Sequence, residues 1–249
     1  MRRENPTVLP VAPQQARVRR GYFECRFGQL HVHNSIPPGG GFEEATALLC
    51  LHDWPGTGRS FTRLLALAGQ DRSAYAPDLP GFGESDPPSP SPAVADYALA
   101  IGDFIDSMRL RHLDVLAVRA GVVLATELAL TRPQQIARLV LISPPLLSEA
   151  ERSAAAPLAL APADAALRPP EWQRWALQAA AQYALRERLA RLTQRALVLR
   201  PRDELWEAAG RVREALPAAR LLEFEAPGQE LLGAAAGRTA EAVREFLRG

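Results

Sequence analysis

The amino-acid sequence predicts an α/β fold with a mostly parallel central sheet flanked by helices. Short, continuous apolar runs at Ala47–His52, Leu113–Val118 and Leu139–Ile142 are typical of strands that are covered on both faces. Between them lie segments whose apolar residues recur three or four positions apart, which indicates helices. This alternation predicts parallel strands joined by right-handed crossovers.

The first half of the chain begins with residues 1–18, a polar and proline-containing stretch that we expect to be a disordered arm. Two strand-like runs on either side of Phe27-Gly28 then indicate a β-hairpin. The elements expected up to the middle of the chain are strands Tyr22–Arg26, Gln29–Asn34 and Ala47–His52, helix Ser60–Ala68, strand Ser73–Pro77 and a helix that begins at Asp96.

The second half contains one interruption of this alternation. Residues 146–193 are rich in alanine and proline and end in a long helical segment, Trp172–Leu192, so we expect a short helical cap inserted over the sheet. The insertion divides the predicted core into residues 19–145 and 194–249. The other expected elements are strand Leu113–Val118, helix Val122–Leu130, strand Leu139–Ile142, strand Ala196–Leu199, helix Leu205–Leu216, strand Arg220–Glu225 and helix Thr239–Leu247.

Composition and charge argue against several classes of partner. The formal net charge of +1 gives no reason to expect binding to nucleic acid or to an anionic membrane. No apolar run approaches the roughly 20 residues that a membrane-spanning helix needs, so we expect a cytoplasmic protein. Every basic residue is arginine and none is lysine, which favours a GC-rich genome and a bacterial source.

The cysteine and histidine content gives no sign of a metal or of a disulfide framework. Cys25 and Cys50 lie in apolar, strand-like runs, and we expect both to be buried small side chains. His31 and His33 alternate on a strand, and we interpret them as edge or surface positions and not as ligands. We therefore expect no metal and no cofactor, with a small molecule as the partner.

Four segments resemble the α/β-hydrolase family in motif, order and spacing: LLCLHDWPGTGRSF, APDLPGFGESDPP, LDVLAVRAGVVLATELALTRP and LVLISPP. The resemblance covers residues 22–145 and resumes more weakly from residue 195. Its most specific part is Asp78–Ser85, which is close to the family's DxxGxGxS turn. His52–Gly56 resembles the HGxPG loop, with Asp53 in place of glycine. The resemblance implies an α/β-hydrolase fold and, ordinarily, a serine, histidine and acid triad.

The resemblance places the family's nucleophile on a tight strand-to-helix turn, GxSxG, called the elbow below. Here the elbow reads Ala117-Val118-Arg119-Ala120-Gly121. Arg119 holds the nucleophile position, and its guanidinium stays protonated, so it cannot act as an ordinary nucleophile or base. No serine occurs between Ser107 and Ser143, so a shift of register supplies none.

The histidine and acid positions of the family lie in the second half of the chain. Gln229 holds the histidine position, and the four histidines, at positions 31, 33, 52 and 112, all lie upstream. Asp203 or Glu204, after the strand Ala196–Leu199, would fit the acid position, and we prefer Asp203. A solvated charged turn explains the same residues equally well.

A fixed cation at the elbow needs an anion, because a helix N-terminus already carries a partial positive charge. One arrangement is an internal ion pair between Arg119 and Asp203 or Glu204. The other is a carboxylate, sulfate or phosphate ligand held between Arg119 and the backbone donors of Ala120 and Trp54. Drift in an inactive protein is a third explanation of the arginine.

Two further residues complete the predicted ligand site. His52 and Asp53 belong to the loop that carries the second backbone donor, so we expect both beside the ligand.

Three functions remain open on these observations. The first is a degenerate hydrolase that binds a small, possibly anionic ligand. The second is an active hydrolase or lyase that acts on a small ester or carboxylate-bearing substrate and uses Arg119 as electrophile for an oxyanion. The third is a protein-interaction module that uses the cap as its contact surface.

Overall fold

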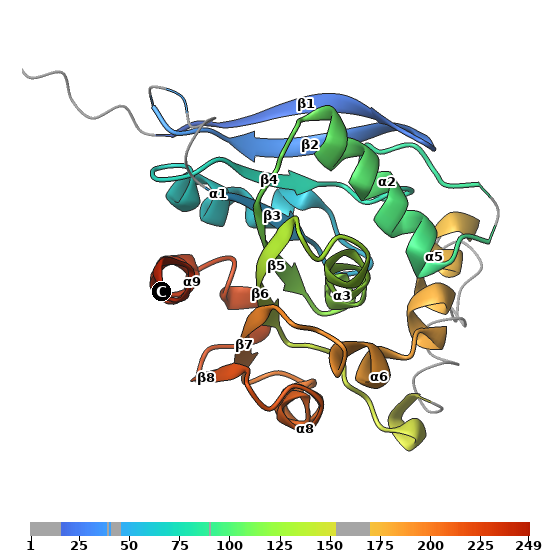
Figure 1. Cartoon of the computed structure of the whole chain (residues 1–249), viewed down its shortest axis with the longest axis vertical. Coiled ribbons are helices and arrows are strands. Elements are labelled where there is room, and N and C mark those ends of the chain that lie inside the picture. The colour runs from blue at the N-terminus through green and yellow to red at the C-terminus, as the bar shows by residue number, and fades with distance from the viewer. Residues whose placement is uncertain (1–15, 39, 41–45, 90, 153–169) are drawn as a thin grey trace, which may run out of the picture.

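The computed structural model describes residues 16–38, 40, 46–89, 91–152 and 170–249, and these residues build one eight-stranded sheet (Figure 1). The strand order is β1-β2-β4-β3-β5-β6-β7-β8. The pairs β1–β2 and β2–β4 are antiparallel, and all the other neighbours are parallel. The strands are β1 (Val18–Cys25), β2 (Gly28–Ser35), β3 (Ala47–Leu51), β4 (Ala74–Pro77), β5 (Leu113–Val118), β6 (Ile136–Ile142), β7 (Arg195–Pro201) and β8 (Arg220–Phe224).

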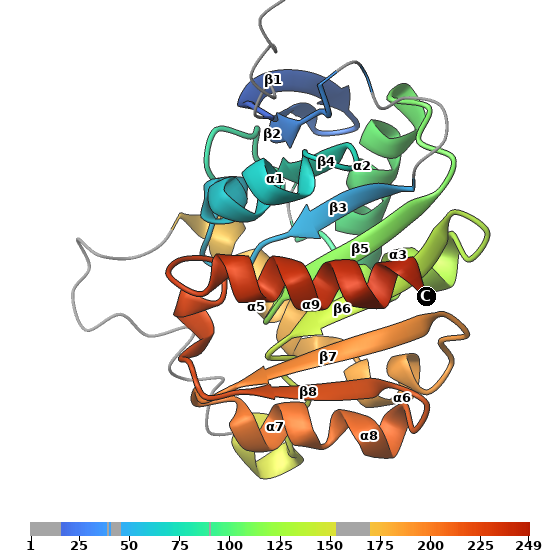
Figure 2. The ribbon, with the colours of Figure 1, turned by 90° about the vertical axis from the view of Figure 1, so that its left-hand side faces the viewer.

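Helices cover both faces of this sheet. Figure 2 shows α1 and α9 in front of the strands, whereas α2, α3 and α6 lie on the opposite side in Figure 1. The apolar core is divided by the sheet in the same way, with one buried cluster on each face. The helices are η1 (Gly58–Phe61), α1 (Thr62–Ala68), α2 (Val94–Ser107), α3 (Gly121–Thr131), α5 (Glu171–Gln182), α6 (Leu185–Leu189), α7 (Trp206–Gly210), α8 (Val212–Ala215), η3 (Gly228–Glu230) and α9 (Ala236–Arg248).

The predicted α/β class and mostly parallel sheet are confirmed, and the reason is visible in β5. All six of its residues are buried, because the strand lies in the middle of the sheet with helices on both sides. On α2, Tyr97, Ile101 and Phe104, which recur three or four positions apart, are fully buried. A continuous apolar run and a helical apolar stripe thus report burial on two faces and on one face respectively.

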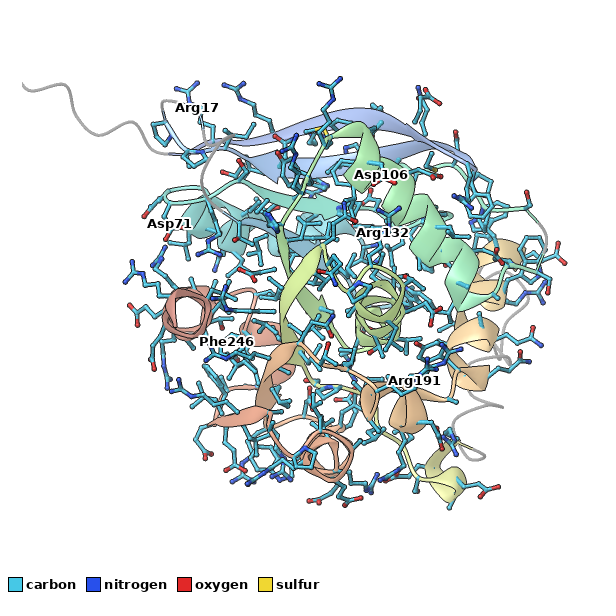
Figure 3. The ribbon with its side chains drawn as sticks, viewed as in Figure 1. Arg17, Asp71, Asp106, Arg132, Arg191 and Phe246 are labelled. Atoms are coloured by element: carbon cyan, nitrogen blue, oxygen red, sulfur yellow. The ribbon has the colours of Figure 1, made fainter. Side chains whose placement is uncertain are left out.

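A polar contact between Arg132 and Asp106, both labelled in Figure 3, also joins the end of α3 to α2. Arg132, directly after α3, donates two hydrogen bonds of 2.7 Å to the carboxylate of Asp106 on α2. Gly102 leaves the space for this guanidinium, since a Cβ there would lie 2.5 Å from its Nη2 atom. This contact fixes the end of the helix whose other end forms the elbow.

The structure corrects the predicted long helix Trp172–Leu192. Helix α5 ends at Gln182, Tyr183 has extended backbone angles, and α6 begins at Leu185. The break has a tertiary cause: the Tyr183 hydroxyl donates a 2.8 Å hydrogen bond to the buried Glu127 on α3. The helix expected at Leu205–Leu216 is likewise divided, into α7 and α8.

The environments of the histidines on β2 and of the two cysteines differ in part from the expected ones. His31 and His33 are buried and not at an edge, because β2 lies between β1 and β4. Cys50 is buried as expected, but Cys25 is only half-buried.

Residues 1–15 of the expected arm and 153–169 of the expected cap lie outside the described residues, while Val18 already belongs to β1. Among the described residues, no helix is long and apolar enough to cross a membrane.

Candidate functional site

The elbow connects the end of β5 to the start of α3 through two residues, Arg119 and Ala120. Arg119 has a φ of 51°, a conformation that costs a non-glycine residue about 1–3 kcal/mol and is kept only where the surroundings enforce it. Its N–H donates to the carbonyl of Ile142 at 2.9 Å. A Cβ on Gly121 would lie 2.5 and 2.7 Å from the carbonyl oxygens of Leu51 and His52, so only glycine fits there. The tight turn predicted from the motif is therefore present.

The Arg119 side chain lies between two carboxylates. Its Nη2 donates to Glu204, and its Nε is 3.3 Å from Oδ2 of Asp53. Burial acts to lower the pKa of Arg119, but the hydrogen bond to Glu204 and the charges of Asp53 and Glu204 outweigh it and raise that pKa. The hydrogen bond from Arg119 in turn lowers the pKa of Glu204. Arg119 is thus a fixed cation whose charge is compensated inside the protein.

Asp53 occupies the two backbone donors that the sequence assigned to a ligand. Its Oδ1 accepts hydrogen bonds from the N–H of Trp54 at 2.8 Å and from the N–H of Ala120 at 3.1 Å. Burial raises the pKa of Asp53, opposed by the Ala120 N–H and by the charge of Arg119. One carboxylate therefore bridges the start of α3, the loop after β3 and the guanidinium at the elbow.

Asp203 and Glu204 have different partners. Glu204 reaches Arg119, whereas Asp203 accepts a 2.7 Å hydrogen bond from the Ser143 hydroxyl and a 3.0 Å hydrogen bond from the N–H of Leu205. Asp203 also lies against Gly228, next to the histidine position of the motif. Of the two acids considered as ion-pair partners of Arg119, Glu204 is therefore the one in contact. Asp203 lies where β7 ends, at the predicted acid position.

The expectation that His52 belongs to the ligand site needs correction. Its ring is 1% exposed, and both nitrogens bond to the backbone: Nδ1 lies 2.7 Å from the Asp53 carbonyl, and Nε2 accepts from the N–H of Leu79 at 2.9 Å. Since Nε2 accepts, Nδ1 carries the proton and the ring is neutral. Burial lowers the pKa of His52 to about 4. His52 thus holds two loops together from behind the site.

Gln229 lies in the 3-10 turn η3, after β8, as its motif position requires. Its side chain lies outside the described part of the structure.

A cavity of about 360 Å³ adjoins Arg119, and we call it the elbow cavity. Three charged residues line it: Asp53, Arg119 and Arg152. Most of the rest of its wall is apolar and includes Trp54, Val123, Leu146, Leu147, Leu185 and Leu205. Arg152, at the end of residues 91–152, was not among the predicted site residues, and its only signal in the sequence is its place in the expected cap.

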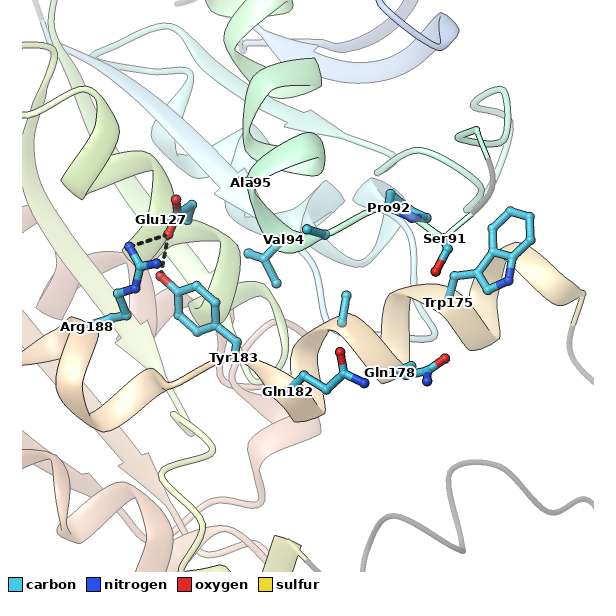
Figure 4. Close-up of a pocket in the computed structure, with 12 residues that line it drawn as sticks. Ser91, Pro92, Val94, Ala95, Glu127, Trp175, Gln178, Gln182, Tyr183 and Arg188 are labelled. Atoms are coloured by element: carbon cyan, nitrogen blue, oxygen red, sulfur yellow. Dashed lines mark hydrogen bonds and ion pairs between the residues drawn. The ribbon is translucent and has the colours of Figure 1, made fainter.

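A second cavity of similar volume lies between the start of α2 and helix α5 (Figure 4). Glu127 lies in its wall, with the Tyr183 hydroxyl at 2.8 Å and the Arg188 guanidinium at 3.4 Å. Gln178 and Gln182 face the same space. Tyr183 lines both cavities, a role that no local sequence pattern predicts.

A buried group of His31, His33 and Asp78 has its ligand-type atoms within 4.8 Å of one another. The carboxylate of Asp78, however, already accepts the N–H groups of Gly58 at 2.6 Å and Glu84 at 3.0 Å, and lies 2.9 Å from His31 Nδ1. Its acceptor positions are used to hold the DxxGxGxS turn and the loop before α1. The group has a structural explanation without an ion.

Comparison with known proteins places these features in a family. The sequence profile described as alpha/beta hydrolase fold matches residues 46–222. Epoxide hydrolase 2 of Siraitia grosvenorii is 34% identical over 102 residues, which are 39% of this chain and 32% of that protein. The matched stretches span only about a third of the curated relatives.

Solved structures resemble the chain over nearly its whole length. A thermophilic esterase from Thermogutta terrifontis, determined with malate bound, has a TM-score of 0.74 and 16% identity and covers 92% of this chain and 98% of its own. The enol-lactonase from Burkholderia xenovorans LB400 has a TM-score of 0.73 and 17% identity, with 92% and 100% covered. At these identities the likeness is one of fold.

Proposed function

Because the chain belongs to the alpha/beta hydrolase fold family, we propose that it has lost serine-type hydrolysis and keeps the elbow cavity as a binding site for a small ligand. The observation that carries this proposal is the guanidinium of Arg119 at the nucleophile position, compensated by Asp53 and Glu204. A guanidinium has no lone pair available to attack an acyl carbon or to accept its proton.

The surroundings of Arg119 support the same proposal. Acyl transfer needs backbone donors that are free to stabilise the developing oxyanion. Here the N–H groups of Trp54 and Ala120 both donate to Asp53. The chain also has no histidine after position 112 to move a proton. Three separate requirements of the triad mechanism are thus unmet at one site.

Small-molecule binding fits the elbow cavity better than the alternatives do. An electrophilic Arg119 in a triad-free enzyme would still need a group that moves a proton, and the chain has no histidine after position 112. A protein-interaction module would not need a cavity of about 360 Å³ behind its surface.

We further propose that α5 and α6 belong to a cap, residues 146–193, that supplies one wall through Ala180, Tyr183 and Leu185.

Hydrolysis of short-chain nitrophenyl esters tests the loss of hydrolysis. We expect the purified protein, Arg119→Ala and Arg119→Ser to give no turnover above a heat-denatured control. Arg109→Ala is the matched control, because Arg109 also has a positive φ but is exposed away from the cavity. Turnover that Arg119→Ala abolishes and Arg109→Ala preserves would overturn the proposal.

A further inference from the structure

We propose that the elbow cavity takes a monocarboxylate with an apolar body, and that Asp53, on the backbone donors beside Arg119, is a built-in competitor for the polar end of this ligand. The inference rests on the proposed function and names its ligand class.

The polar end of the cavity already binds a carboxylate. One oxygen of Asp53 accepts two backbone N–H groups, at 2.8 and 3.1 Å, and the other lies 3.3 Å from Nε of Arg119. Two convergent amides, one of them at the start of an eleven-residue helix, and a guanidinium form a set of donors suited to a carboxylate. A ligand carboxylate that replaced Asp53 would meet the same donors.

Asp53 is able to leave these donors. Its side chain is 37% exposed, so solvent is available to it on one side. Burial raises the pKa of Asp53 in its present place, because the ionised carboxylate loses hydration there. The carboxylate regains this hydration when it turns to solvent. A ligand carboxylate in the place of Asp53 brings the same charge to Arg119, while the displaced Asp53 carboxylate turns to solvent.

The two departures from the family motif meet at this point. Asp53 replaces the glycine of the HGxPG pattern and Arg119 replaces the serine of the elbow, and the two side chains contact each other although they are far apart in sequence. Arg119 supplies a cation to the donor pair, and Asp53 fills the pair when no ligand is present. Together they turn a site for a transient oxyanion into a site for a permanent anion.

The rest of the cavity selects the body of the ligand. Beyond the polar end, its wall is formed largely by Trp54, Val123, Leu146, Leu147 and Leu205. Burial of an alkyl or aryl body against this wall supplies binding free energy that a bare carboxylate lacks. Octanoate is therefore a suitable probe, acetate tests the carboxylate alone, and octanol tests the apolar body alone.

The experiment is isothermal titration calorimetry of the full chain with these three compounds. In Asp53→Gly, which vacates the donors, we expect octanoate to bind about tenfold or more tightly than in the unmodified protein, as the release of charge-assisted hydrogen bonds implies. Octanol should bind both proteins equally. Adding Arg119→Ala to Asp53→Gly should abolish the gain for octanoate and leave octanol binding unchanged.

Asp53→Asn guards against the chance that the glycine variant fails to fold. It keeps the size of the side chain and removes its charge, so octanoate affinity should again rise. Octanoate binding no tighter in either variant than in the unmodified protein would overturn the inference, as would an equal gain for octanol. These results would leave the proposed function intact, whereas ester turnover that Arg119→Ala abolishes and Arg109→Ala preserves would overturn the proposed function itself.

Discussion

Arg119 keeps the backbone conformation of the elbow but places a guanidinium where the family motif has a serine hydroxyl. Its positive φ is fixed by β5, by Gly121 and by the hydrogen bond to Ile142, none of which depends on its side chain. The side chain is then free to differ as long as its charge is met, and Asp53 and Glu204 meet it. The neighbours of Arg119 thus determine the backbone geometry of the elbow, and its side chain determines the chemistry.

Gly121 tests the first half of this argument. Gly121→Ala should lower the free energy of unfolding by about 1–3 kcal/mol or more, because the methyl group would collide with two carbonyl oxygens. Gly237→Ala is the matched control on α9, where a Cβ meets nothing within 4 Å. It should be neutral or stabilise by up to about 1 kcal/mol through helix propensity. Urea denaturation measures both, and equal effects would contradict the argument.

His52 gives a prediction about pH. Its pKa is lowered to about 4 in the folded protein, from an ordinary value of 6.5. The unfolded chain therefore binds this proton first as the pH falls, so the contribution of His52 to stability is full above pH 6.5 and is lost progressively down to about pH 4. The loss is on the order of 3 kcal/mol.

Urea denaturation at pH 7.5 and pH 4.5 measures this loss. The drop in stability between the two pH values should be smaller in His52→Gln than in the unmodified protein. His112→Gln, at an exposed histidine, is the control and should change nothing. A drop of the same size in all three proteins would contradict the assignment of a buried, neutral His52.

At the scale of elements, α2 shows how a helical stripe divides into core and surface. Ile101 is fully buried and Leu99, two positions earlier, is 44% exposed. Ile101→Ala should cost about 2–5 kcal/mol of stability, whereas Leu99→Ala should stay within about 0.5 kcal/mol. Thermal denaturation of the two variants checks this, and a cost for Leu99→Ala close to that of Ile101→Ala would contradict the packing of α2.

Strands with a continuous apolar sequence were the most predictable elements. Leu113–Val118 has the bounds expected from its letters, because every one of its side chains is buried and no tertiary contact has to be known. The break at Tyr183 was not predictable, since the surrounding Ala-, Leu- and Arg-rich segment has high helix propensity throughout. The hydrogen bond to Glu127, a residue far away in the sequence, decides it.

The candidate site divides in the same way. The elbow and Arg119 follow from a motif with fixed spacing. Asp53 accepts hydrogen bonds from the N–H groups of Trp54 and Ala120 because two loops meet at this point. The motif spacing within either loop does not predict this meeting. The choice between Asp203 and Glu204 as partner of Arg119 required the turn after β7 to be known in three dimensions.

For the molecule as a whole, the two helices before β7 are attached unequally. Helix α5 has one buried residue in twelve, Ala176, whereas the five-residue α6 buries Leu185 and Leu189 in the core. Backbone amides of α5 should therefore exchange with deuterium faster than those of α3, since local opening of α5 exposes little apolar surface. Mass spectrometry of peptic fragments measures this, and equal protection of α5 and α3 would contradict it.

The covalent tether of Asp53 has a consequence for competition. Asp53 directly precedes Trp54, so its carboxylate meets the Trp54 amide at an effective concentration that dilution of the protein does not change, in the millimolar range or above even for a flexible link. Small acids such as acetate or formate would make only the hydrogen bonds and the ion pair that the Asp53 carboxylate already makes. Only an acid that also buries an apolar body, at about 25 cal/mol per Å², is able to displace it. In the competition that we propose for Asp53, the tether sets a threshold that simple acids without an apolar body do not reach.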